Sequence, residues 1–486
     1  MIPFTPQILT TDVLVWLLVA TFAGFAVYVR HHKHLLAPWR RVVQNTSGMV
    51  AFTVLSLFVV VGLLDSLHYR ALVGEHDGKP VYAVEVLSVL DKITETLRTR
   101  EEKTYSAPFA AYLYAKETIE NPEGQAITIR AYPRLLYGGA HLSNPDKELT
   151  GDVMRRGLRG VGVGAVIWLA LCVVLCLLLG RRREGGLRVA WREIWAGETE
   201  VPWRAVLITL AVILAVATPL VKLSAYYHVF GTDKVGQDVF YLALKSVRTG
   251  LVIGTLTTLV MLPFAILLGT MAGYFKGWVD DLIQYLYTTL NSIPGILLIA
   301  AAVLMMQVYI ETNSERFAST IERADFRLLW LCLILGVTTW TGLCRLLRAE
   351  TLKIREMEYI QAAQAFGVSH LRILARHVVP NVMHLVLIAV VLDFSGLVLA
   401  EAVLAYIGVG VDPSMNSFGG MINSARLEMA REPMVWWLLA AAFTFMLLIV
   451  LSANLLADAV RDAFDPRVRG RTLSVERLRE LASEDA

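Results

Sequence analysis

The sequence predicts an all-α integral membrane protein. Of its 486 residues, 56% are hydrophobic and 18% are charged. With glycine counted in and tyrosine left out, the apolar share is about 60%, whereas soluble domains hold roughly 45–50%. The apolar residues also gather in runs long enough for a membrane-crossing helix, which needs about 17 to 25 residues. Both observations argue against a water-soluble enzyme of several domains.

Nine such runs predict nine transmembrane helices. They cover residues 13–29, 48–64, 161–180, 205–221, 250–274, 286–308, 328–344, 382–400 and 434–456. The first run has no Lys or Arg before it and no clear small-residue cleavage site after it, so a membrane helix is favoured over a signal peptide. The net charge of +3 gives no basic footprint for nucleic acid. The apolar runs predict membrane lipid as a partner, and the charge balance predicts no nucleic acid.

The basic residues of the short loops predict the orientation, because such loops stay in the cytoplasm when they are rich in Lys and Arg. With the N-terminus outside, the inner loops contain 17 Lys and Arg and the short outer segments contain 9. The inner loops are then 30–47, 181–204, 275–285 and 345–381, and the outer segments are 1–12, 222–249, 309–327 and 401–433. The C-terminus lies in the cytoplasm.

A long polar stretch, residues 65–160, lies outside on this topology and predicts a small mixed α/β insertion. It has a helical pattern over 86–117, an alternating run over 126–132 and turn-rich text over 137–148. A solvated cap and a docking surface for a partner both fit it. The glycines that follow, Gly160, Gly162 and Gly164, open an apolar run, which favours close helix packing over a nucleotide-binding loop.

The inner loop 345–380 is the second polar stretch and predicts two helices joined by a glycine. Residues 351–366 contain no Gly or Pro and end at Gly367, the usual residue just past a helix end. Ser369 begins a second short helix. This helix either ends at Pro380 or continues there into the next span. Ala362 and Ala363 beside Tyr359 and Phe366 suit a helix that fits a groove on another protein. An amphipathic loop on lipid headgroups is the alternative.

At this point residues 358–381, EYIQAAQAFGVSHLRILARHVVPN, resemble the EAA signature of binding-protein-dependent ABC transporter permeases. Gln361, Ala362, Ala363, Gly367 and Pro380 fall on its spacing. The signature's Glu is Gln361 here, and Glu358 lies about one turn before it. The resemblance implies that the helix from Glu358 to Phe366 docks into an ATPase subunit.

Further segments, in family order over about 200–467, resemble the second permease subunit of dipeptide and oligopeptide importers. They include GYFKGWVDDLI (273–283), NSIPGILL (291–298) and the glycine-rich text after Glu401. The segment GTDKVGQDVF resembles a family GTD..GRD loop through five residues, Gly231, Thr232, Asp233, Gly236 and Asp238. Its arginine is replaced by Gln237.

The resemblance implies a six-helix type I ABC importer permease core over 205–467. Three extra transmembrane helices precede it: a pair in 1–64 and a third in 161–204, which also holds a cytoplasmic linker. The insertion 65–160 separates them, and 468–486 is a cytoplasmic tail. The first 200 residues lie outside the resemblance.

The family also implies the machinery around the chain: a second permease subunit, two ATPase subunits and an extracytoplasmic binding protein, in the bacterial cytoplasmic membrane. The sequence has no GxxxxGK[ST] loop to hold the phosphates of ATP. The chain is thus predicted to be a transporter subunit without catalytic residues, metal or cofactor of its own, while ATP and Mg bind to the partner subunits. The substrate is predicted to be a peptide; nickel, a sugar or an antimicrobial peptide are alternatives, and a stand-alone secondary transporter is a weaker one.

Polar residues within spans are candidates for the transport pathway, because an ionisable group at a helix centre costs roughly 2.5–3.5 kcal/mol. Asp393 and Glu401 lie in or at the end of the eighth run and Asn454 in the ninth. For Asp393, pathway lining and an interhelical contact stay open. For Glu401, a structural hydrogen bond at a loop is favoured.

Overall fold

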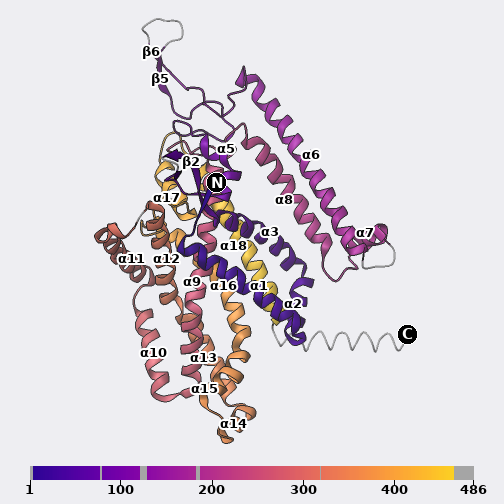
Figure 1. Ribbon diagram of the computed structural model, residues 1–486, viewed down its shortest axis with the longest axis vertical. Coiled ribbons are helices and arrows are strands. Elements are labelled where there is room, and N and C mark those ends of the chain that lie inside the picture. Colours follow the sequence, from indigo (N-terminus) through magenta and orange to yellow (C-terminus); the bar gives the residue numbers. More distant parts are fainter. Residues whose placement is uncertain (1–3, 77–78, 121–127, 182–185, 318, 465–486) are drawn as a thin grey trace.

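The computed structural model describes residues 4–76, 79–120, 128–181, 186–317 and 319–464; the predicted tail 468–486 lies outside them. Helices dominate, with small sheets at one end (Figure 1). Within the described ranges, nine helical segments are long and apolar enough to cross a membrane, which confirms the predicted number. They are α1 (Thr10–His31), α3 (Thr46–Asp65), α6 (Pro145–Gly180), α8 (Trp203–Ser224), α9 (Val239–Phe275), α11 (Gly295–Thr312), α12 with α13 (Thr320–Thr339, Thr341–Arg355), α15 with η2 and α16 (His370–Ile373, Leu374–Val378, Val379–Tyr406) and α18 (Trp437–Phe464).

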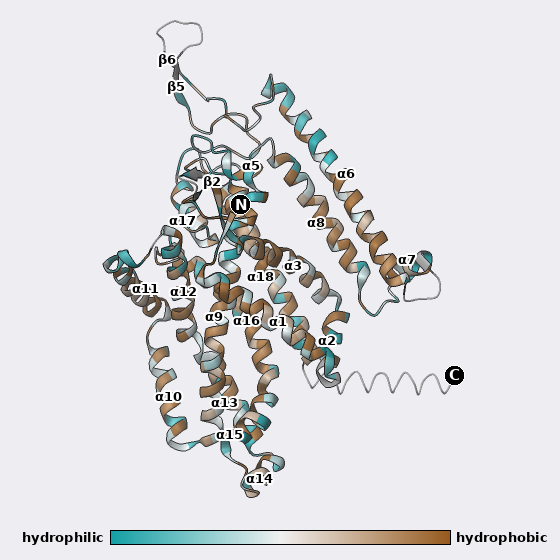
Figure 2. Ribbon diagram, in the orientation of Figure 1, coloured by the Kyte–Doolittle hydropathy of each residue, from teal (hydrophilic) through white to brown (hydrophobic). Residues whose placement is uncertain are grey.

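The centre of the helical bundle is α9, which packs against α3, α12, α13, α16 and α18. Its 37 residues make a helix of about 55 Å. Small residues let α13 approach it closely, since a Cβ on Gly269 would lie 2.8 Å from the carbonyl oxygen of Cys344. Hydrophobic residues make up much of the length of these helices (Figure 2). A membrane provides the solvent that such a surface needs.

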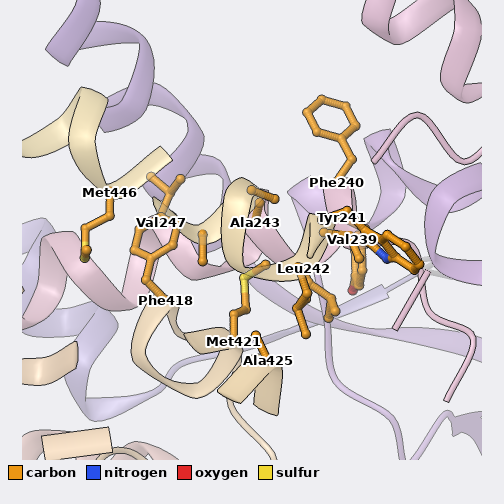
Figure 3. Packing of buried hydrophobic residues seen from close by; sticks show 14 of the residues in the cluster. Val239, Phe240, Tyr241, Leu242, Ala243, Val247, Phe418, Met421, Ala425 and Met446 are labelled. Carbon is orange, nitrogen blue, oxygen red and sulfur yellow. The ribbon is translucent and has the colours of Figure 1, made fainter. Parts of the chain in front are cut away.

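The bundle has two ends: the insertion side, where the described residues of the range 66–144 lie, and the α14 side, where α14 (Glu358–Ala365) lies (Figure 1). On the insertion side, α17 (Phe418–Glu428) packs against the first turns of α9. Figure 3 shows Phe418 and Met421 among the side chains of Leu242, Ala243 and Val247. This apolar cluster fixes the loop before α17 over the end of the bundle.

The first two spans, predicted as additions to the core, are bonded into the same bundle. Helix α3 packs against α18 and α9, and α1 against α12. Buried ion pairs reinforce the packing: Arg248 Nη2 of α9 lies 2.6 Å from Asp12 Oδ1 of α1, and Lys245 Nζ lies 2.6 Å from Asp65 Oδ1 of α3. Buried charges need such partners. Helix α2 (Lys33–Gln44) joins α1 to α3 and touches α18.

Helices α6 and α8 form a hairpin beside the bundle, with α7 (Gly186–Ala196) at its turn (Figure 1). A Cβ on Gly160 would lie 2.6 Å from Cα of Pro219, and one on Gly164 2.5 Å from Oγ1 of Thr218. The predicted packing role of these two glycines is confirmed, whereas Gly162 faces open space. Helix α8, the first run of the predicted 205–467 core, makes its main contacts with α6 and α3.

The insertion holds two antiparallel sheets. Strand β2 (His68–His76) pairs with β1 (Phe4–Gln7), β3 (Lys79–Tyr82) and β4 (Leu87–Ser88), and β5 (Glu117–Glu120) pairs with β6 (Thr128–Ala131). The alternating run 126–132 thus contains a strand, as predicted. Strand β1 was not predicted; it ties the start of the chain to the insertion.

Two local predictions were wrong, and a third was wrong at its end. The helical pattern 86–117 yields only α4 (Val89–Ile93) and α5 (Glu95–Thr99), because the backbone of residues 102–109 bonds to residues 228–236 instead of to itself. Residues 137–144 of the turn-rich text 137–148 form turns and bends as predicted, but its last residues belong to α6, which begins at Pro145, a residue that suits a first helical position. The run 286–308 breaks at Pro294, between α10 (Gly277–Ser292) and α11, because proline has no N–H to continue the helix. The remaining short helix is η1 (Ser314–Arg316).

Candidate functional site

The predicted helix 351–366 is broken in two by an extended residue. Helix α13 ends at Arg355, Met357 has φ −70° and ψ 140°, and α14 follows. A single helix was therefore the wrong prediction. Ile354 and Ile360 are both buried, although six residues of continuous helix would place them about 120° apart around the axis. The break at Met357 re-aims α14 so that Ile360 also reaches the apolar cluster.

Gly367 ends α14 as predicted. It has φ +75°, a conformation in which glycine is the least strained residue. The N–H of Gly367 donates to the carbonyl of Gln364 and that of Val368 to the carbonyl of Ala363. This pair of bonds is a Schellman motif. Ser369 takes the N-cap position of α15, but its side chain makes no capping hydrogen bond.

Helix α14 is fixed to the bundle by one buried side chain and a small polar network. Ile360 has no exposed surface and packs in a cluster with Ile373, and Ala363 lies against the same cluster. Tyr274 of α9 lies with its hydroxyl 2.9 Å from His370 Nδ1, and the Gln364 amide donates to that hydroxyl at 3.1 Å. We call α14 and α15, with the turn at Gly367 between them, the elbow. It is rigid because α9, α14 and α15 are held together at one point.

The opposite face of the elbow is apolar and exposed. Phe366 is 87% exposed, and Leu371, Tyr359 and Met357 are also exposed. Ala362 lies on the same exposed surface, and Ala363 is half-buried. An unpartnered aromatic at a protruding tip (Figure 1) is the kind of residue that buries in a groove on another protein.

The remaining predicted residues of this element have defined places. Gln361 Nε2 donates to the carbonyl of Glu356 at 3.2 Å, a bond that a glutamate carboxylate is unable to make. Glu358 is exposed in the first turn of α14, where a negative charge is favourable. Pro380 lies in the first turn of α16, which continues from the π-helical turn η2.

Comparison with known proteins identifies the family of this chain. A family model described as "Binding-protein-dependent transport system inner membrane component" matches residues 265–470. The oligopeptide transport system permease protein OppC of Mycobacterium tuberculosis is 31% identical over 242 residues, which are 50% of this chain and 77% of that protein. The chain belongs to the binding-protein-dependent permease family.

Two further relatives extend the match. The dipeptide permease DppC of Alkalihalophilus pseudofirmus is 29% identical over 54% of this chain and 84% of its own length. The glutathione permease GsiD of Pectobacterium atrosepticum is 28% identical over 59% and 94%. Permeases of this family work in ABC importers with an ATPase and a binding protein, and the permease is not itself an enzyme.

On the insertion side, the five family-matching residues lie in loop 231–238, which we name the GTD loop. Thr232 exchanges hydrogen bonds with residues 104–106: its Oγ1 accepts from the Ser106 N–H at 2.6 Å and donates to the Thr104 carbonyl at 2.9 Å. A Cβ on Gly236, which has φ +86°, would lie 1.8 Å from the carbonyl oxygen of Glu102. Gly231 likewise faces Ser106 at φ +72°. The insertion thus docks onto this loop of the permease.

The two aspartates of the GTD loop shape it from within. Asp233 Oδ1 accepts from the N–H groups of Val235 and Gln237, each at 2.9 Å. Asp238 is the N-cap of α9 and accepts from the Phe240 N–H at 2.8 Å. Such side-chain to backbone bonds fix tight turns and helix starts.

A buried histidine links the GTD loop to the insertion electrostatically. His228 Nδ1 lies 2.7 Å from Asp238 Oδ2, and its Nε2 lies 3.4 Å from Glu102 Oε1. Burial alone would lower the pKa of His228, but the bond to Asp238 and the contact with Glu102 outweigh it and raise the pKa to about 9. Burial likewise opposes the ionisation of Glu102, yet His228 and the N–H groups of residues 136–138 lower its pKa to about 2. A charged histidine between two carboxylates results.

The polar residues predicted within spans are placed differently from one another. Asn454 Oδ1 of α18 accepts from Ser395 Oγ of α16 at 2.6 Å, an interhelical contact. Glu401 is buried and its Oε2 accepts from the Gly419 N–H at 3.2 Å. Asp393 is half-buried in α16.

Several residues that shape these sites were missed from the sequence. Tyr274 and His370 are 96 positions apart in the sequence and contact each other beside α14. Glu102 and His228 are 126 positions apart and also lie in contact. Tyr274 and His370 lie in two different family segments quoted above, and neither pair falls within a single local motif. The sequence signal closest to His228 is the GTD loop, which begins shortly after it.

Proposed function

We propose that the chain is the second permease subunit of an ATP-driven peptide importer and forms half of its membrane pathway. The observation that supports this proposal most is the elbow at α14. Ile360 is buried and anchors the helix to the bundle, whereas Phe366 is 87% exposed. In this proposal the α14 side faces the cytoplasm and the insertion side faces outward. The charge bias of the loops, 17 against 9 Lys and Arg, supports that orientation.

The proposed partners follow from the family. A second permease completes the pathway, two ATPase subunits bind ATP and Mg, and an extracytoplasmic binding protein delivers the substrate. The peptide class is supported by relatives named for oligopeptide, dipeptide and glutathione transport. The six spans from α8 to α18 form the permease domain in this proposal, and α1, α3 and α6 are additions to it.

Coupling would pass through the elbow. Closure of the ATPase dimer moves α14, and because α14 is bonded to α9 through Tyr274 and to α13 through the short link at Met357, the displacement reaches both helices. A rigid connection is needed for this, since a flexible loop would absorb the movement. The Schellman end at Gly367 and the buried Ile360 provide that rigidity.

The test is an Ala362→Glu variant of the complete importer, purified through a tag on this chain. Ala362 is exposed, so the substitution leaves the fold intact while it adds charge to the docking face. We expect ATPase recovery and peptide-stimulated ATP hydrolysis to fall at least tenfold. Ala196→Glu, at an exposed alanine that ends α7, is the matched control and should change neither. Equal behaviour of the two variants would contradict the docking role of α14.

A further inference from the structure

Two cavities meet on the insertion side of the permease. One, of about 370 Å³, lies between the GTD loop, α12 and the segment that leads into α17. The other, of about 430 Å³, lies at the ends of α11 and α12, and both are lined by Arg327, Asp412 and Pro413. The size of each suits a small ligand. The shared residues place the two cavities side by side, and we name them together the trough.

Arg327 lines both cavities and has donor groups that are not fully hydrogen-bonded. Its side chain is only 12% exposed, and its Nη2 donates to the Gly410 carbonyl at 3.2 Å. Its Nη1 is 3.8 Å from Asp412 Oδ2, longer than a hydrogen bond. Among the described residues its Nε has no hydrogen-bond partner. Buried donors in native proteins are normally paired. The unpaired Nε and the long contact of Nη1 with Asp412 leave this guanidinium, beside a cavity, able to take a further acceptor, which points to a ligand.

The charge around Arg327 favours an anion. Asp412 already accepts from the backbone and hydroxyl of Ser414 at 3.0 and 2.7 Å. A second guanidinium, that of Arg323, lies 4.0 Å from the same carboxylate. At Asp412 two cations therefore share one acid, while Glu311 adds a second carboxylate to the lining of the other cavity. A guanidinium presents a planar set of donors that matches a carboxylate in a bidentate way.

The rest of the first cavity suits a peptide main chain. Gln237, Asn416 and Asn423 line it, and each amide both donates and accepts hydrogen bonds. Such groups pair with the N–H and C=O of a peptide whatever its side chains are. Asp233 also lines the cavity and supplies a negative charge on the same surface.

We propose that this trough binds a short peptide with a free carboxyl terminus, with the terminal carboxylate on Arg327 and the main chain on the amides of Gln237, Asn416 and Asn423. The inference rests on the proposed function, because it gives the importer a contact site for its substrate on the permease itself. Arg327 would select for the free terminus, and the amides would accept any sequence.

A labelling experiment tests the site without the binding protein. Ser424 is exposed and lines the cavity, and the four native cysteines of this chain are buried. In the importer purified without its binding protein, Ser424→Cys should therefore be the site on this chain that reacts with a charged, membrane-impermeant thiol reagent. We expect saturating trialanine to slow this labelling at least fivefold and trialanine amide to slow it less than twofold. Ser143→Cys, an exposed serine away from the trough, should label at the same rate with either peptide.

Second substitutions separate ligand binding from structure. In the Ser424→Cys background, Arg327→Gln should abolish protection by trialanine, and Asp412→Asn should retain it. If Arg327 only neutralised Asp412, the two substitutions would act alike. No protection, equal protection by both peptides, or an unchanged Arg327→Gln would each overturn the site.

Failure of the site and failure of the proposed function give different results. The wild-type importer, reconstituted with its binding protein, either takes up radiolabelled trialanine or does not. Uptake together with unprotected Ser424→Cys would remove only the trough. Absence of any peptide uptake, with ATPase subunits present, would remove the proposed substrate class as well.

Discussion

The charged state of His228 should control how firmly the insertion is held to the permease. The perturbation is a change of pH or the substitution His228→Gln. In the native protein His228 is buried between Asp238 and Glu102. We call the contacts of His228 with Asp238 and Glu102 the clasp. Opening of the clasp exposes His228 to water, where its pKa returns to 6.5. The proton is therefore held more tightly in the closed state.

The magnitude follows from the two pKa values. A rise from 6.5 to about 9 corresponds to on the order of 3 kcal/mol, since one pKa unit is about 1.4 kcal/mol. That stabilisation is complete below pH 6.5 and is lost as the pH rises toward about 9. Glu102 behaves in the opposite sense: its contribution is present above pH 4.5 and is lost as the pH falls toward about 2. The clasp should be tightest between pH 4.5 and 6.5.

Hydrogen exchange of the permease in nanodiscs measures this directly. The amides of Glu102 and Phe109 bond to the carbonyls of Gly236 and His228, so their protection reports opening of the clasp. After correction for intrinsic exchange rates, protection should fall by roughly tenfold per pH unit between 6.5 and 9. Amides in the middle of α9 should show no such slope, because their environment contains no titrating group of this clasp.

The variant supplies the refutation. His228→Gln removes the titrating group and leaves two buried carboxylates without a cation, which should cost about 3–5 kcal/mol and give protection that no longer depends on pH in this range. A flat profile in the wild type would contradict the reasoning. So would an equal slope in His228→Gln, since some other group would then be responsible.

Three further predictions concern single contacts. Gly236→Ala should release the insertion and raise its sensitivity to protease, because the new Cβ would meet the Glu102 carbonyl at 1.8 Å; unchanged proteolysis would show that the loop relaxes freely. Phe366→Ala should weaken ATPase recovery yet leave the thermal midpoint nearly unchanged, because the ring is 87% exposed and surface substitutions usually stay within about 0.5 kcal/mol. Arg248→Gln should destabilise the protein by about 3–5 kcal/mol, because buried Asp12 loses its guanidinium partner and keeps the 2.7 Å contact with His68 Nδ1. Adding Asp12→Asn should recover part of the thermal midpoint; a further decrease would count against the ion pair as the cause.

The spans were predictable because a single physical demand acts on each of them. A backbone in hydrocarbon must satisfy its own hydrogen bonds, so a long apolar run becomes a helix whatever lies beside it. The lengths were less predictable: α9 starts at Val239, eleven residues before the apolar run does. That first part of α9 is stabilised by packing against α17 and the insertion rather than by lipid.

At the elbow, too, some features follow from local sequence signals and others from tertiary packing. Gly367 and Pro380 are local signals, and both lie where a helix end and a first helical turn were expected. The break at Met357 has no local signal, since neither glycine nor proline occurs near it. It arises because Ile354 and Ile360 must both reach one apolar cluster, a condition that only the tertiary packing imposes.

By itself the sequence determined the membrane class, the number of spans and the family, because hydropathy and short motifs are properties of contiguous residues. Only the tertiary structure decided which residues meet: Glu102 with His228, Tyr274 with His370, and Arg327 with Asp412 beside the trough. Each of these contacts joins segments that are far apart in the chain. Their chemistry depends on burial and distance, and neither quantity is encoded in the spacing of residues along the sequence.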